Sequence, residues 1–230
     1  IIVNLSACGD DDSDSPETPM NPEAKHITRI VQEEDDGDKT EYIFSYDSQG
    51  RVTSMVEKET DRTRASYTYT QTYDFTYGDN TVTINRDNKY TYAYSLLNGR
   101  ITSCKRESQY SSNTQAKVTT YSYDTQGHLV SMNENDENRT YTWSGGDLTE
   151  ADETDIEYDG ERHHWYKIDY SSHTTPANYI PIFLFDSREA ALAMMGFFGK
   201  MPIHLVSNIR ENHTDDGYRT TTLVYRMQDG

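Results

Sequence analysis

The sequence is poor in hydrophobic residues and has no long, uninterrupted hydrophobic run. Only 33% of its 230 residues are hydrophobic, whereas globular chains typically have about 45–50% when glycine is counted. The most apolar stretch, residues 179–206, is interrupted by Asp186, Arg188 and Glu189. Charges at these positions exclude a membrane-spanning helix in that stretch.

Basic residues are scarce as well. The chain has 21 Lys and Arg against 39 Asp and Glu, which gives a formal net charge of −18 at pH 7. A surface of this sign repels the phosphates of nucleic acids and of anionic membranes. We therefore expect no nucleic-acid partner, and attachment to a membrane would need a different cause.

The chain has only two cysteines, and the first supplies such a cause. Leu5-Ser6-Ala7-Cys8 resembles the bacterial lipobox in all four positions and follows a short apolar segment. The resemblance implies cleavage before Cys8 and acylation of its thiol, so that residues 1–7 are the end of a signal peptide. The alternative is a chance match. With Cys8 lipidated, only Cys104 remains, and no intramolecular disulfide can form.

A polar segment follows the lipobox. Residues 8–25 are acidic and rich in proline, and such a segment cannot bury enough apolar surface to fold, so we expect a disordered, lipidated linker. Its acids, at positions 10–12 and 14, resemble the export signal of Bacteroidetes lipoproteins that face the cell exterior. The resemblance implies an outer-membrane location, whereas the alternative is an ordinary solvated linker.

From residue 26 onward the sequence is mostly strand and turn. In "SYTYTQTYDFTY", residues 66–77, aromatic residues occupy the odd positions from Tyr67 to Tyr77, apart from Gln71, and mostly threonines occupy the even ones. Successive side chains of a strand point to opposite faces, so this pattern predicts an aromatic face backed by a threonine face. We expect the aromatic face to form the core, with a ligand-binding surface as the alternative.

A hairpin pattern recurs along the chain. The segments are "YDSQGRVTSM" (46–55), "YSLLNGRITSC" (94–104), "YDTQGHLVSM" (123–132) and the degenerate "WSGGDLTEA" (143–151). The glycines at positions 50, 99 and 127 fall where the chain must reverse with a positive φ. Val52 and Met55 are three residues apart, so they lie on opposite faces of a strand unless a bulge intervenes.

These features predict a mainly β fold. We expect an antiparallel meander of about a dozen strands, curled into a barrel or half-barrel, in one domain over residues 26–230. One short helix is expected near 187–198, capped by Asp186 with Glu189 three residues on and ended by Gly199. The final "YRMQDG" is typical of a hairpin start, so we expect the natural chain to continue.

Together, "LSAC" with its acids, the "YDxxGRVTSM" hairpins and "FFGKMPIHLVS" resemble a family of Bacteroidetes lipoproteins of unknown function with a porin-like fold. The resemblance implies a fold and carries no catalytic residues. The hairpins also resemble tyrosine-aspartate repeats of secreted proteins, although Tyr46, Tyr94, Tyr123 and Trp143 are unevenly spaced.

The sequence contains no convincing catalytic or metal-binding motif. We therefore expect no cofactor and no metal, and we name no catalytic residue. Trp143, Trp165 and Tyr166 adjoin polar loops, so they are the best candidates for exposed ligand-binding aromatics. The sequence favours a non-catalytic binding module for a glycan or another extracellular ligand. The alternatives are an assembly partner in an outer-membrane surface complex and an unassigned hydrolase.

Overall fold

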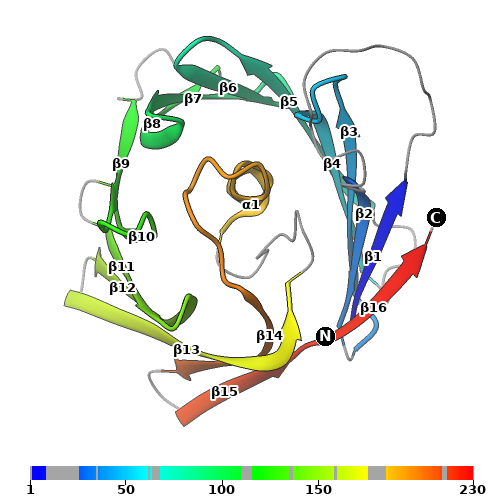
Figure 1. Ribbon diagram of the computed structural model, residues 1–230, viewed down its shortest axis with the longest axis vertical. Helices are drawn as coiled ribbons and strands as arrows, with labels where there is room; N and C mark the ends of the chain where they lie inside the picture. The colour runs from blue at the N-terminus through cyan, green and yellow to red at the C-terminus, as the bar shows by residue number, and fades with distance from the viewer. Residues whose placement is uncertain are drawn as a thin grey trace.

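Strands curl around one helix in the computed structural model (Figure 1). The structure describes residues 2–8, 26–34, 36–61, 63, 68–109, 116–134, 137–157, 160–175, 185–213 and 217–229. Within these residues there are 16 strands in one sheet, more than the dozen expected, and one helix. Residues 9–25 of the expected linker lie outside the described residues, as does Tyr67.

The strands follow one another along the chain with short connections. Their bounds are β1 Ile2–Cys8, β2 His26–Glu33, β3 Lys39–Tyr46, β4 Val52–Thr60, β5 Thr68–Tyr77, β6 Thr81–Arg86, β7 Tyr90–Leu97, β8 Arg100–Ser108, β9 Lys117–Tyr123, β10 Leu129–Glu134, β11 Glu137–Ser144, β12 Asp147–Glu157, β13 Gly160–Thr174, β14 His204–His213, β15 Gly217–Thr222 and β16 Val224–Asp229. The helix, α1, spans Ser187–Met194 and lies between β13 and β14 in the sequence.

The sheet is an antiparallel meander, as predicted. Each strand from β1 to β15 pairs with its sequence neighbour, and β16 pairs in parallel with β1 at the far edge. Since Leu223 alone separates β15 from β16, the two edges of the sheet belong to one continuous stretch of chain. No ladder joins β15 to β16, so among the described strands the sheet is curled but not closed into a barrel.

The aromatic faces form the core, as the alternation predicts. Tyr73 and Phe75 of β5 are buried, and so are Tyr92 and Tyr94 of β7. Their neighbours of opposite parity point outward and are partly or fully exposed, for example Thr76. Tyrosine can line this interior where its hydroxyl finds a polar partner, as those of Tyr94 and Tyr121 do.

The predicted hairpin units are present, and each contains a bulge. The φ angles of the turn glycines at positions 50, 99 and 127 are +74°, +76° and +95°. Just after each turn the strand carries one extra residue, and the register shifts there in β4, β8, β10 and β12. The bulge turns Val52 and Met55 to the same side, and both are buried. The structure thus decides the alternative that the sequence left open.

Each bulge exposes a backbone carbonyl oxygen, which accepts a hydrogen bond from an aromatic side chain of the next strand. We call these contacts the aromatic–bulge hydrogen bonds. The four that follow the repeated turns run from Tyr77 to Val52 O (2.6 Å), Tyr123 to Ile101 O (2.8 Å), Trp143 to Leu129 O (2.7 Å) and Tyr170 to Leu148 O (2.7 Å). A fifth joins Tyr46 to Ile27 O at the bulge of β2. They satisfy buried acceptors that the ladder leaves unpaired.

The loss of one aromatic–bulge hydrogen bond should measurably lower the stability of the fold. Tyr170→Phe is expected to lower the free energy of unfolding by about 1–3 kcal/mol, because Leu148 O is left without its donor. Tyr90→Phe is the matched control, since within the described residues the Tyr90 hydroxyl has no hydrogen bond and its ring contacts persist. Urea denaturation compares the two. Equal stability of both variants would contradict the role of the hydroxyl.

The helix is capped as predicted but is shorter. Asp186 is the N-cap and accepts a hydrogen bond from Glu189 N at 3.2 Å. The helix ends at Met194, because Gly196 (φ +80°) reverses the backbone there, and Gly199 does not end it. Gly199 serves a close approach instead, since a Cβ atom on it would lie 2.2 Å from Gly127 O. Leu192 and Phe198 are fully buried, whereas Met195 and Phe197 are partly buried, so the segment fills the curled sheet.

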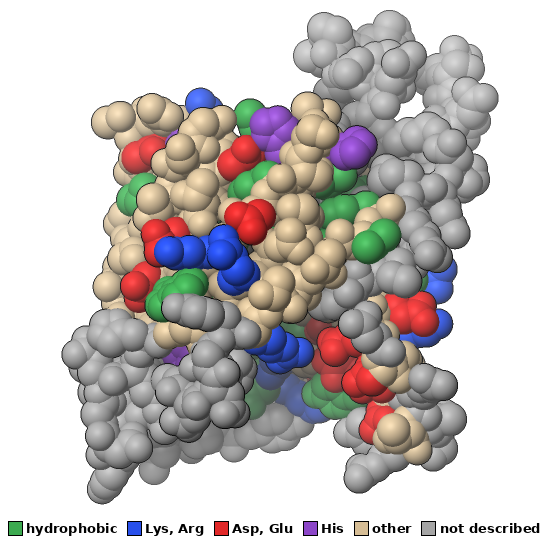
Figure 2. All heavy atoms as spheres, turned by 90° about the horizontal axis from the view of Figure 1, so that it is seen from below, with side chains coloured by type: hydrophobic (Ala, Val, Ile, Leu, Met, Phe, Trp, Pro, Cys, Tyr) green, Lys and Arg blue, Asp and Glu red, His purple; other side chains and the backbone are tan. Residues whose placement is uncertain are grey.

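The outer face is polar and mixed. Figure 2 shows small, separate groups of hydrophobic, acidic and basic side chains on one face, and none of these kinds gathers into a large patch among the described residues. No helix in the described part of the chain is long and apolar enough to cross a membrane.

Candidate functional site

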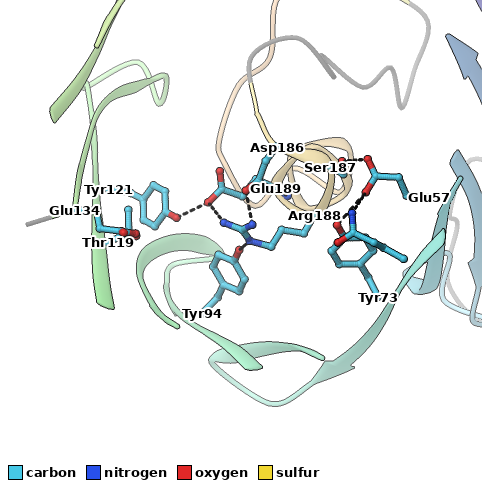
Figure 3. A network of polar contacts seen from close by, with 11 residues as sticks. Glu57, Tyr73, Tyr94, Thr119, Tyr121, Glu134, Asp186, Ser187, Arg188 and Glu189 are labelled. Atoms are coloured by element: carbon cyan, nitrogen blue, oxygen red, sulfur yellow. Dashed lines mark hydrogen bonds and ion pairs between the residues drawn. The ribbon is translucent and has the colours of Figure 1, made fainter. Parts of the chain in front are cut away.

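The first turn of α1 carries polar side chains into the interior, where they reach three parts of the sheet (Figure 3). Ser187 Oγ donates to Glu57 Oε1 of β4 at 2.7 Å. Arg188 Nε donates to the Tyr94 hydroxyl of β7 at 3.2 Å. Glu189 Oε1 accepts from the Tyr121 hydroxyl of β9 at 2.8 Å. The helix is thus fixed in orientation by polar contacts as well as by packing.

The Tyr94 hydroxyl is available to Arg188 because β6, the strand before it, has no bulge, unlike β2, β4, β8, β10 and β12. The pairing of β6 shows no register shift, so β6 offers no bulge carbonyl to the next strand, and the Tyr94 hydroxyl can accept from the helix instead. The Arg188 guanidinium also lies 4.1 Å from the centre of the Tyr92 ring and forms an ion pair with Asp186.

Two charged side chains of this turn, Glu189 and Arg188, are largely buried, with 3% and 18% of their surface exposed. The pKa of Glu189 is raised from its usual 4.5 to about 7, chiefly by burial and then by the charge of Asp186, while Arg188 and the Tyr121 hydrogen bond partly oppose the rise. Desolvation lowers the pKa of Arg188, but Tyr94, Asp186 and Glu189 together hold it well above its ordinary value. Arg188 therefore stays charged, and Glu189 is the group here that titrates near neutral pH.

A cavity of about 290 Å³ lies beside this turn. Its walls come from β11, β12, β13, β14 and the residues just before α1. The lining residues are Arg139, Tyr141, Ala151, Glu153, Tyr166, Phe185, Asp186 and Ile209. Arg139 and Asp186 keep 30% and 46% of their side chains exposed, so solvent reaches the cavity.

Two features define the chemistry of the cavity. Arg139 and Glu153 lie directly opposite each other on β11 and β12, and Nη2 of Arg139 is 2.5 Å from Oε1 of Glu153. Aromatic rings of Tyr141, Tyr166 and Phe185 form the rest of the wall. The site therefore offers aromatic surface next to a charged donor and a charged acceptor, which suits a small polar ligand.

The carboxylates of the cavity are ion-paired, and the thiol of Cys104 is buried. Both carboxylates that line the cavity are ion-paired, Glu153 with Arg139 and Asp186 with Arg188. Cys104 is buried, and burial raises the pKa of its thiol to about 12, so it is not a nucleophile at neutral pH. Among the described residues no three potential metal ligands come together.

The predicted binding aromatics are separated and none is fully exposed. Trp143 is half-buried, donates to Leu129 O and stacks on His128 with ring centres 4.5 Å apart. Trp165 is half-buried, with Lys167 Nζ 5.1 Å from its ring, and the pairing alternation puts it on the outer side of β13. Tyr166, the next residue, lines the cavity. The expected exposure was wrong because the polar loops nearby do not determine which side of the sheet a ring faces.

The charged residues of the cavity were missed from sequence. Arg139 and Glu153 sit in strands with many other charges, and only the register brings them opposite each other. Cys8 lies at the end of β1, where its backbone pairs with His26. Its lipidation stays a prediction.

Comparison with known proteins identifies the fold. A family model described as "domain of unknown function (DUF4595) with porin-like fold" matches residues 44–225. A porin-like protein from Bacteroides uniformis is 16% identical, with a TM-score of 0.65 over 87% of this chain and 85% of that one. A porin-like protein from Bacteroides vulgatus is 12% identical, with a TM-score of 0.59 over 88% of each chain. Among curated proteins there is no match.

Proposed function

Since the chain belongs to the family of domains of unknown function with a porin-like fold, we propose that it is a lipid-anchored binding module on the outer membrane. Its ligand is a small polar molecule, a short glycan foremost, held in the cavity beside α1. The single observation that carries the ligand proposal is the Arg139–Glu153 pair set against aromatic walls.

The chemistry of the cavity matches a sugar. A sugar ring has an apolar C–H face that packs on aromatic side chains, and hydroxyls that both donate and accept hydrogen bonds. Tyr166 and Phe185 supply aromatic surface, while Arg139 donates and Glu153 accepts. The volume of about 290 Å³ lies near the lower limit of ligand sites, roughly 300 Å³. A saccharide of very few rings fits this size.

The location rests on the lipobox. Leu5-Ser6-Ala7-Cys8 supports lipid anchoring, and the acids that follow support export to the cell exterior. A net charge of −18 gives the protein no electrostatic attraction to anionic lipids, so acylation of Cys8 is the means of attachment.

Two adjacent residues of β13 provide a matched test. A glycan array first identifies a saccharide, and calorimetry then measures its affinity. Tyr166→Ala is expected to weaken binding at least tenfold, about 1.4 kcal/mol, because it removes a wall of the cavity. Trp165→Ala, on the opposite face, is expected to leave the affinity unchanged.

The other outcomes are equally informative. Loss of binding with Trp165→Ala alone would move the site to the outer face of the sheet. A blank array with folded protein would contradict the glycan proposal and favour an assembly partner in a surface complex. Release of a cleaved saccharide would contradict the non-catalytic proposal.

A further inference from the structure

Strand β1 coincides with the segment that lipobox cleavage removes. Cleavage before Cys8 takes away every residue of β1 except the last. In the structure β1 lies between β2 and β16 and pairs with both (Figure 1). Its removal therefore leaves two unpaired strand edges facing each other, one strand width apart.

The directions of the remaining strands allow them to pair. β16 is parallel to β1, and β1 is antiparallel to β2, so β16 runs antiparallel to β2. Through β1, Val224 is aligned with Glu33, and Met227 is aligned with Ile30. Residues aligned across a sheet share a face, so closing the gap in this register keeps position 227 on the same face as the buried Ile30.

We propose that the edge of β2 exposed by cleavage is an interaction surface, and that its partner is β16 of the same chain. The two strands pair directly and antiparallel, with Val224 opposite Glu33 and Met227 opposite Ile30. The proposal rests on the lipoprotein processing proposed above.

The tether to β15 favours β16 over a strand from another molecule. Leu223 is buried, and its N–H donates to Ser207 O at 2.9 Å, so β16 is held beside the gap at high effective concentration. To reach β2 it moves by one strand spacing, about 4.8 Å.

The rearrangement also removes an irregularity. The β1–β16 pair is the one parallel pair among the described strands. Without β1, the thirteen strands from β2 to β14 and the continuous run 217–229 form an all-antiparallel ring of fourteen. Closure leaves no unpaired edge for aggregation.

A cysteine pair tests the proposal. Val224→Cys and Glu33→Cys are combined in two chains, one that spans residues 1–230 and carries Cys8→Ser, and one that begins at Gly9. With β1 in place the two Cα atoms are separated by two strand spacings, about 9.6 Å, which exceeds the roughly 7 Å that a disulfide spans. Direct pairing brings them to about 4.5–5.5 Å. We expect the yield of intramolecular disulfide to be at least about tenfold higher in the chain that begins at Gly9 than in the chain that keeps β1.

Two control pairs calibrate the result. Thr76→Cys with Thr83→Cys, directly opposite on β5 and β6, should oxidise equally in both chains. Val224→Cys with Gln32→Cys places the thiols on opposite faces and should not oxidise in either. Equal yields of the test pair in both chains, or no disulfide in the chain from Gly9 while the β5–β6 pair oxidises, would overturn the proposal. A disulfide between two molecules would assign the edge to a partner's strand and overturn it as well.

Cleavage of the chain and acylation of Cys8 are measured in a separate experiment. The mass of the native protein from the membrane fraction shows whether residues 1–7 are removed and Cys8 is acylated. An uncleaved native chain would contradict the lipoprotein part of the proposed function, whereas the disulfide yields in the two defined chains would still decide whether β16 pairs with β2.

Discussion

Phe198→Ala is expected to lower the free energy of unfolding by about 3–5 kcal/mol. The side chain is fully buried inside the curled sheet. Its ring centre lies 5.0 Å from that of Phe185 and 5.2 Å from that of Tyr121. Truncation leaves a cavity between the helix segment and the sheet, and the fixed strands around it cannot collapse to fill it.

Urea denaturation at fixed pH measures this loss. Phe198→Leu, which keeps most of the buried volume, should cost much less. Leu97→Ala is the surface control, because that side chain is 64% exposed and its removal should leave stability nearly unchanged. A loss below about 1 kcal/mol for Phe198→Ala would mean that the helix segment contributes little to the fold.

Glu189 is expected to make the protein less stable as the pH rises from about 4.5 to about 7. Burial raises the pKa of this carboxyl in the folded state from 4.5 to about 7. In that window the unfolded chain releases the proton while the folded chain keeps it, so the free energy of unfolding falls with pH. Above pH 7 the raised pKa of this group lowers the free energy of unfolding by about 3 kcal/mol. Below pH 4.5 it vanishes, because both states are protonated.

Glu189→Gln removes the titration and keeps an acceptor for Tyr121. The measurement is the free energy of unfolding of both proteins at several pH values between 4.5 and 8. The difference in free energy of unfolding between Glu189→Gln and the native protein should change between about pH 4.5 and about pH 7 and stay constant above that. The exposed Glu107 serves as a control through Glu107→Gln, which should leave the pH profile unchanged. A constant difference for Glu189→Gln over the whole range would refute the prediction.

The sequence predicted the hairpins because their signals are local. The turn glycines and the aromatic alternation each act within a few residues, and both are found where they were expected. Asp186 likewise caps α1 as predicted. The end of the helix was misplaced because two nearby glycines, Gly196 and Gly199, both have positive φ, and only the packing of Gly199 against the β9–β10 turn distinguishes them.

The cavity could not be predicted because it depends on a one-residue shift. Without the bulge in β12, the turn at 145–146 would place Arg139 opposite Asp152. The bulge moves Glu153 into that position and onto the inner face. Choosing between these carboxylates requires the register of the strands, which the pattern of charges alone does not give. The same reasoning explains why Trp165 and Tyr166 were treated alike although they face opposite sides.

The aromatic–bulge hydrogen bonds have a consequence for how such a sheet can change in length. Three hairpins, β3–β4, β9–β10 and β11–β12, each contribute one donor to the strand before and one carbonyl to the strand after, as β3–β4 does through Tyr46 and Val52. A hairpin added between two others would bring both halves of this joint and leave the remaining joints intact. The circumference can therefore grow or shrink by two strands at a time, with only the central helix segment left to readjust to the new width.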